Sequence, residues 1–230
     1  MNLNQSDSQT SELKFSGTTK GSAVFHAVRR RILLGEIPPG TPLIEQHLGR
    51  DFNCSQGTVR EALLRLQEEG LVDRRGYRGT IVAKISVAEA IQMAKIRIDL
   101  EMESIKQAAL KFTEKELIQV TELINDMDKA VLSGDQYTVS EIDRLVHLTI
   151  FRASGLVALE PILNRCTLHM HLYTFGGERA WDRLQSPGEA HQPILDALSA
   201  RDPEKAAQAM KLHITDVIEF WAPPLKLALE

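Results

Sequence analysis

Residues 55–83 read SQGTVREALLRLQEEGLVDRRGYRGTIVA, and this stretch decides the fold of the N-terminal part of the chain. Ser55 is a favourable N-cap, a residue whose side chain accepts a hydrogen bond from the first turn of a helix. The residues that follow place aliphatic side chains on one helical face, at Val59, Ala62, Leu63 and Leu66. Gly70 favours the end of this helix, and residues 71–75 and 80–83 resemble two short strands joined by a hairpin tip. The pattern predicts a helix followed by a two-stranded wing.

Two more helices are expected before this stretch. Residues 22–34 place three aliphatic side chains on one helical face, at Val24, Val28 and Ile32. The run Pro-Pro-Gly at residues 38–40 stops that helix. Residues 43–51 form the expected second helix, with Thr41 as its cap and Pro42 at its first position. Three helices followed by a two-stranded wing make a winged helix-turn-helix, in which the N-terminal turn of the third helix faces DNA.

The expected DNA contacts come from that turn and from the wing. Ser55 and Thr58 can hydrogen-bond to phosphates. Gln56 suits an adenine edge, and Arg60 can reach a phosphate or a guanine. The wing adds electrostatic contacts through three basic residues, Arg74, Arg75 and Arg78. The alternative for Arg60 is an ion pair with a neighbouring carboxylate, and Ser55 can serve as a cap alone.

Charge is distributed unevenly along the 230 residues. Residues 20–85 hold 11 Lys and Arg against 7 Asp and Glu, whereas residues 86–230 hold 15 against 22. A basic N-terminal segment on an otherwise acidic chain suits nucleic-acid binding by residues 20–85 alone, because phosphates attract locally concentrated positive charge. On charge alone, a chance excess on a solvated face explains the difference equally well.

The rest of the chain has the pattern of an all-helical domain. Capping boxes of the form Ser/Thr-x-x-Glu open helical runs at Ser86, Thr113 and Ser186. Helices are expected near residues 86–110, 114–132, 136–153, 157–175, 188–200 and 203–221. The fold class is therefore mainly α, a winged helix-turn-helix followed by a bundle of about six helices. The expected organisation is a flexible arm at 1–19, the DNA-binding domain at 20–85, the helical domain at 86–222 and a tail at 223–230.

The cellular location follows from what the sequence lacks. No run of apolar residues is long enough for a membrane span, and residues 1–20 have no apolar segment typical of a signal peptide. Two cysteines, Cys54 and Cys166, are too few for a disulfide framework or a cysteine metal cage. We expect a reduced, cytoplasmic protein with no membrane partner.

Four residues of the helical part are candidate metal ligands. Asp143 and His147 are one helical turn apart, so both side chains can bind one ion. His191 and His213 occupy semi-apolar positions on the last two expected helices, and helical bundles build metal sites from such converging side chains. Imidazole with carboxylate suits zinc, nickel, iron or manganese rather than calcium. The alternative for each histidine is an ordinary surface or core position.

The N-terminal part closely resembles the GntR family of bacterial transcription regulators. The resemblance rests on residues 28–40, 43–48, 58–63 and 69–72, and it spans nearly all of residues 22–83. It implies a cytoplasmic homodimer that binds operator DNA with an affinity set by a small-molecule effector. The family often has Arg where this chain has Gln56, and Pro or Thr where it has Gly57. Because glutamine suits adenine, we expect a departure from the usual guanine-rich half-site.

The C-terminal part resembles the all-helical ligand-binding domain of the FadR-type subgroup, called the FCD domain. The resemblance rests on Arg97-x-x-x-Glu101, Asp143-x-x-x-His147, Glu189-x-His191 and His213. It implies a divalent metal ion, with zinc as the first candidate, held by four ligands, Asp143, His147, His191 and His213. The metal then anchors a small carboxylate effector at open coordination positions.

Arg97 is the candidate second anchor for this effector, because a guanidinium can grip a carboxylate with two hydrogen bonds. Its alternative role is an ion pair with Glu101 on the same helix. The leading hypothesis is thus a ligand-responsive regulator, in this family most often a repressor. The alternatives are a metal-dependent enzyme that uses the Asp/His cluster, and a regulator whose metal is purely structural.

Overall fold

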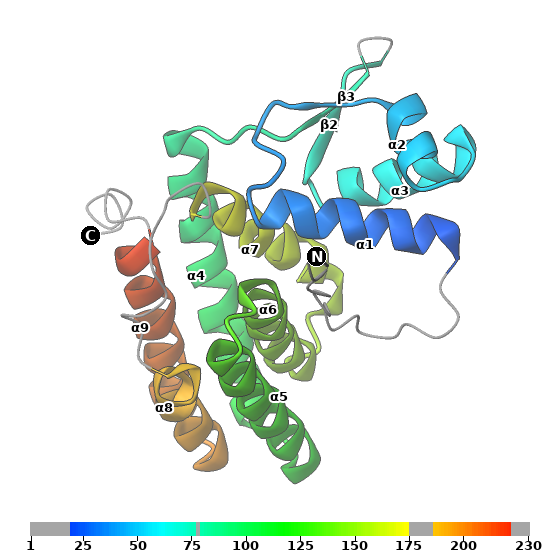
Figure 1. The fold of residues 1–230 in the computed structure, drawn as a ribbon. Helices are drawn as coiled ribbons and strands as arrows, with labels where there is room; N and C mark the ends of the chain where they lie inside the picture. Colours follow the sequence, from blue (N-terminus) through cyan, green and yellow to red (C-terminus); the bar gives the residue numbers. More distant parts are fainter. Residues whose placement is uncertain (1–18, 77–78, 175–185, 222–230) are drawn as a thin grey trace, which may run out of the picture.

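The computed structural model describes residues 19–76, 79–174 and 186–221 (Figure 1). Its N-terminal part holds the three expected helices, α1 (Lys20–Leu33), α2 (Glu45–Asp51) and α3 (Gln56–Glu68). It also holds three short strands, β1 (Pro42–Leu43), β2 (Val72–Arg74) and β3 (Thr80–Val82). The winged helix-turn-helix is confirmed. The expected arm, apart from its last residue, the expected tail and Arg78 at the tip of the wing lie outside the described residues.

Strand β1 is a feature that the sequence did not predict. Pro42 and Leu43 pair with Ile81 and Thr80 of β3, so the sheet is three-stranded and antiparallel in the order β1-β3-β2. The prediction that Pro42 begins the second helix was wrong, because α2 begins at Glu45 after Ile44 as its N-cap. The Val82 N–H donates to Thr41 O at 3.0 Å and thereby holds this segment extended. A proline is tolerated there because β1 is an edge strand, where no donor is needed on the open side.

The core of the N-terminal domain forms between α1, α3 and the sheet, from the aliphatic faces that the sequence predicted. Two further members of this core, Leu168 and Leu172, come from helix α7 (Glu160–Thr174) of the C-terminal domain and are 0% and 8% exposed. Burial of one leucine side chain contributes about 1.5–3 kcal/mol. The two domains therefore share an apolar contact.

The described residues of the C-terminal domain form helices joined by short loops. Its helices are α4 (Val87–Ala109), α5 (Glu114–Leu132), α6 (Gln136–Ala153), α7 (Glu160–Thr174), α8 (Pro187–Ser199) and α9 (Pro203–Trp221), with a short 3₁₀ helix η2 (Val157–Leu159) before α7. The capping boxes that begin α4 and α5 are formed as predicted. Helix α8 also begins directly after Ser186, its N-cap residue, as predicted. The predicted capping box at Ser186 is wrong, because the Ser186 hydroxyl makes no cap hydrogen bond and donates instead to Asp128 of α5 at 3.0 Å.

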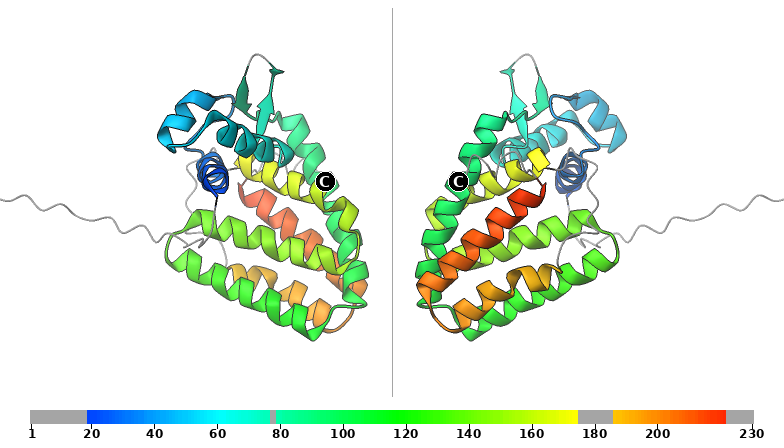
Figure 2. Two further views of the ribbon diagram at one scale, coloured as in Figure 1. Left: turned by 90° about the vertical axis from the view of Figure 1, so that its right-hand side faces the viewer. Right: turned by 90° about the vertical axis from the view of Figure 1, so that its left-hand side faces the viewer.

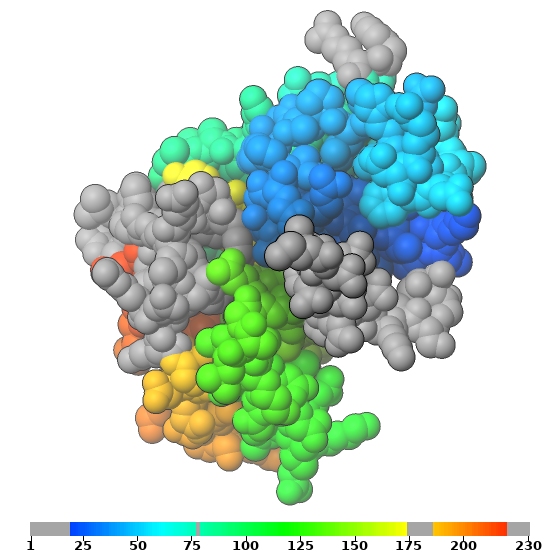
Figure 3. Space-filling view, in the orientation of Figure 1, coloured from blue at the N-terminus to red at the C-terminus, as the bar shows by residue number. Residues whose placement is uncertain are grey.

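The N-terminal domain sits at one end of the helical domain (Figure 2). Helix α7 lies beneath α1, whereas α5 and α8 lie at the far end (Figure 1). In the space-filling view, the blue and cyan surface of the N-terminal domain lies above the green surface of the helical domain (Figure 3). Within the described part of the chain, no helix combines the length and the hydropathy that crossing a bilayer requires.

Candidate metal centre and DNA-reading surface

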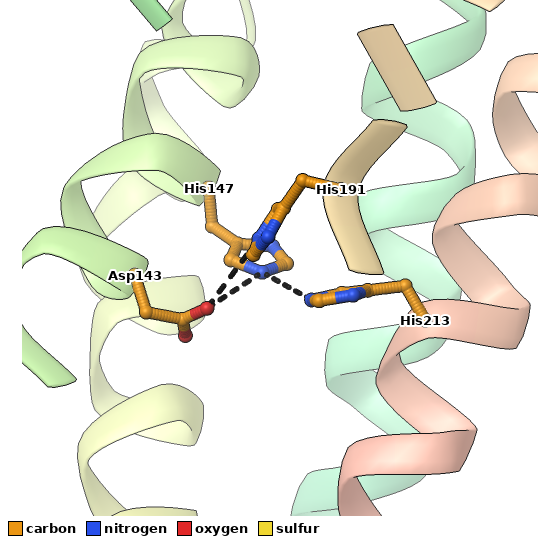
Figure 4. Close-up of side chains that lie close together, drawn as sticks. All are labelled: Asp143, His147, His191 and His213. Atoms are coloured by element: carbon orange, nitrogen blue, oxygen red, sulfur yellow. Dashed lines mark hydrogen bonds and ion pairs between the residues drawn. The ribbon is translucent and has the colours of Figure 1, made fainter. Parts of the chain in front are cut away.

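Four side chains from three helices meet inside the C-terminal domain (Figure 4). Asp143 and His147 project from α6, His191 from α8 and His213 from α9. One ligand atom from each of the four lies within 4.8 Å of the others. The three histidines are 1–6% exposed, whereas the Asp143 side chain is 22% exposed. The imidazoles are therefore buried, and Asp143 is the most exposed of the four residues.

The imidazoles direct their Nε2 atoms towards the centre of the cluster. Asp143 Oδ1 lies 3.5 Å from His191 Nε2 and 3.9 Å from His147 Nε2, and the Nε2 atoms of His147 and His213 are 3.3 Å apart. Ligands about 2.1 Å from a tetrahedral metal ion lie about 3.4 Å apart. His191 Nε2 is buried and has no hydrogen-bond partner among the described residues. The donor set and its spacing therefore fit a divalent ion.

The opposite ring nitrogens of two histidines are held from outside the cluster. His191 Nδ1 donates to the backbone oxygen of Pro187 at 2.7 Å. His147 Nδ1 contacts Glu101 Oε2 on α4. Such outer contacts fix the ring orientation and the tautomer of a metal-binding histidine.

The electrostatics favour the protonation states that bind metal. Burial alone would raise the pKa of Asp143, but the adjacent His191 and the surrounding imidazoles of His147 and His213 hold it well below its usual range. Burial, together with the neighbouring His191 and His147, lowers the pKa of His213 well below its ordinary value. An ionised carboxylate beside a neutral imidazole is the state that a metal ion requires.

Arg97, the predicted effector anchor, lies in the interior of the domain. Its side chain is 4% exposed, and its Nε donates to Glu101 Oε1 at 2.7 Å. The structure therefore shows the ion pair that the sequence left as the alternative role. A direct contact between Arg97 and an effector stays a prediction.

The predicted DNA-reading residues lie at the start of α3 and on the wing. Ser55 caps α3 by accepting from the Thr58 N–H at 3.1 Å, and Gln56 is exposed. Arg60 is exposed and donates to Glu45 of α2 at 2.7 and 3.1 Å, so it forms the ion pair considered for it. The two described arginines of the wing, Arg74 and Arg75, are both exposed.

Three polar residues beside this surface were missed by the sequence analysis. Lys20, Gln46 and Arg50 border the same shallow hollow as the N-terminal turn of α3. Gln46 and Arg50 are one helical turn apart on α2, so a face analysis of that helix could have found them. Together they widen the surface that is suited to phosphate contacts.

Comparisons with known proteins agree with this architecture. Residues 20–82 match the model of the gntR family of bacterial regulatory proteins, and residues 92–216 match that of the FCD domain. The chain therefore belongs to the GntR family and carries an FCD domain. It is a DNA-binding transcription regulator, and the alternative of a metal-dependent enzyme is excluded by this membership.

The relatives support the same class of protein. The HTH-type transcriptional repressor RspR of Escherichia coli K12 is 29% identical over 201 residues, which cover 85% of this chain and 86% of the relative. A probable D-xylose utilization operon transcriptional repressor of Paenarthrobacter nicotinovorans is 28% identical, with coverage of 87% and 88%. The solved structure of E. coli McbR/YncC shares the fold with a TM-score of 0.72 at 21% identity, covering 93% of this chain and 100% of that one.

Proposed function

We propose that this chain is a homodimeric repressor whose affinity for operator DNA responds to a small carboxylate effector bound at a divalent metal ion. The ion is held by Asp143, His147, His191 and His213, with zinc as the first candidate. The observation that carries the proposal is the convergence of these four side chains in one buried cluster. The metal supplies positive charge and coordination positions, and the protein supplies an anionic oxygen and three imidazole nitrogens.

The number of protein ligands separates a sensing site from a structural one. Four protein ligands complete a tetrahedral zinc site and leave no position for an effector. An effector that binds the metal therefore requires five- or six-coordination, which zinc reaches by expanding its coordination and which nickel, manganese and iron readily adopt. We propose that the effector approaches from the side of Asp143, because its side chain, at 22%, is the most exposed of the four.

The two domains proposed here are residues 20–85 and 86–222, and one helix connects the metal cluster to the boundary between them. Helix α6 carries two of the cluster residues and also Glu141, whose Oε2 lies 2.7 Å from Nη1 of Arg29 on α1. The Nε of the same Arg29 lies 2.6 Å from Oε2 of Glu69, the C-cap residue of α3. A shift of α6 on effector binding therefore acts, through Arg29, on α3, the helix that reads DNA. The effector then changes the populations of two arrangements of the DNA-binding domain relative to the helical domain.

The experiment that tests this function measures binding of the purified dimer to the promoters of its own gene and of the neighbouring genes. We expect sequence-preferring, salt-sensitive binding. We also expect small organic acids to change the affinity of the metal-loaded protein and to leave that of the chelated protein unchanged. If acids bind neither form while chelation lowers stability, the metal is structural, and absence of sequence preference contradicts the regulator itself.

The Gln56 side chain yields a prediction about the operator sequence. Replacing it with arginine, Gln56→Arg, shifts the preferred base at the contacted position from adenine to guanine, because arginine pairs with two acceptors of guanine. The expected discrimination is about 1–3 kcal/mol for that position. Selection from a random DNA library measures it, with Gln67→Arg at the other end of α3 as a control that adds the same charge. An unchanged base preference in Gln56→Arg would place Gln56 away from the bases.

A further inference from the structure

The outer contact of His147 differs in kind from that of His191. A backbone oxygen holds the His191 ring, whereas a side chain, Glu101 of α4, holds the His147 ring. Glu101 is 1% exposed and lies 46 residues away in the chain from His147. Glu101 belongs to neither the metal cluster nor the DNA-reading surface, so its burial calls for a separate explanation.

The charge state of Glu101 determines the tautomer of His147. The guanidinium of Arg97 donates its Nε–H to Glu101 Oε1 at 2.7 Å, and this permanent positive charge stabilises the Glu101 side chain as an ionised carboxylate. An ionised carboxylate only accepts hydrogen bonds, and the proton between the two groups therefore resides on Nδ1 of His147. The Nε2 atom of the neutral ring then carries the lone pair, and Nε2 is the atom that faces Asp143 and His213.

Glu101 is itself held in place by Arg97. The Arg97 Nε–H donates to Oε1 at 2.7 Å, while Oε2 contacts His147 Nδ1. Each carboxylate oxygen thus has one donor, and the positive charge of Arg97 offsets the negative charge of Glu101 in the interior. Because one oxygen faces Arg97 and the other faces His147, the two contacts together fix the orientation of the carboxylate.

Resting on the metal centre proposed above, we propose that Glu101 is a positioning residue of that centre. It keeps His147 in the tautomer that presents Nε2 to the ion, and Arg97 keeps Glu101 aligned for this role. Outer-contact residues of this kind raise the basicity of the ligand, and their loss weakens metal affinity by about 10- to 100-fold.

The variant Glu101→Gln tests this role with almost no change in size. A glutamine has one acceptor oxygen, and the permanently charged Arg97 retains it, so the amide NH₂ turns to His147. The imidazole then accepts at Nδ1 and carries its proton on Nε2, where it blocks the metal. Calorimetric titration with Zn²⁺ is expected to show about 10- to 100-fold weaker binding. Glu103→Gln, exposed on the same helix, serves as the control with unchanged affinity.

The wild-type protein provides a second test that does not depend on folding of the variant. The ¹⁵N shifts of the His147 ring in the metal-free protein are expected to show a protonated Nδ1 and an unprotonated Nε2. The reverse tautomer would overturn the inference, as would equal Zn²⁺ affinity of the wild type and Glu101→Gln. Absence of Zn²⁺ binding by the wild type would overturn the proposed metal centre, and this inference with it.

Discussion

His213→Ala is expected to abolish stoichiometric metal binding. The substitution removes one of the four ligands, whose Nε2 lies 3.3 Å from that of His147, and alanine offers no donor atom in its place. We expect the affinity for Zn²⁺ to fall by at least about 100-fold, beyond the loss that follows when an outer contact is removed. Saturating metal at 100 times its dissociation constant stabilises a folded protein by about 2.7 kcal/mol, and this gain disappears in the variant.

Thermal unfolding with and without Zn²⁺ measures the effect directly. The wild type is expected to unfold at a higher temperature with the ion, whereas His213→Ala unfolds at the same temperature in both conditions. His47→Ala, which removes an exposed imidazole from α2, is the matched control and keeps the metal-dependent rise. Full metal stabilisation of His213→Ala would show that the ion binds elsewhere.

Arg29→Met is expected to cause the largest loss of stability. The Arg29 side chain is 3% exposed and pairs with two carboxylates, Glu69 at 2.6 Å and Glu141 at 2.7 Å. Burial opposes its charge, yet Glu141 and Glu69 raise the pKa of Arg29 above its ordinary value. Removing one partner of a buried ion pair costs about 3–5 kcal/mol, because the other charge stays buried without compensation.

Urea denaturation measures this loss, with Arg31→Met on the exposed side of α1 as the control. The triple variant Arg29→Met with Glu69→Gln and Glu141→Gln is expected to recover part of the stability, because the two carboxylates around position 29 lose their charge. The recovery is incomplete because Arg144 loses the Glu141 carboxylate, which lies 3.0 Å away. The triple variant is also expected to lose the effect of metal and effector on DNA affinity. A loss in Arg29→Met no larger than that in Arg31→Met would contradict the buried bridge, and retained effector control in the triple variant would contradict coupling through it.

The sequence predicted the elements of the fold well where the signal is local. The Ser55 cap, the aliphatic face of α3 and the capping boxes at Ser86 and Thr113 depend on residues within one or two helical turns. Strand β1 depends on pairing with β3, about 40 residues later, and two residues carry no periodicity. Its existence could not be read from residues 42 and 43 alone.

In the candidate site, too, the sequence predicted the local features and missed those that depend on tertiary contacts. The spacing of Asp143 and His147 marks one helix, whereas His191 and His213 were candidates only through their semi-apolar positions on two other helices. The assignment of all four to one ion came from the family resemblance, because spacing cannot bring separate helices together. Glu101 appeared in the sequence only as a partner of Arg97, four residues away.

The sequence analysis also missed the buried ion pairs of Arg29, because they depend on tertiary contacts. It lies in a run of three arginines that is typical of a solvated basic face. Only the tertiary contacts of α1 with α3 and α6 distinguish it from its exposed neighbours.

Anomalous diffraction from crystals grown with Zn²⁺, recorded at the zinc edge, tests the central claim most directly. We expect one strong peak within coordination distance, about 2.0–2.2 Å, of Asp143 oxygen and the Nε2 atoms of the three histidines. A peak bound by other residues, or density showing the four side chains turned away from a common centre, would contradict the account.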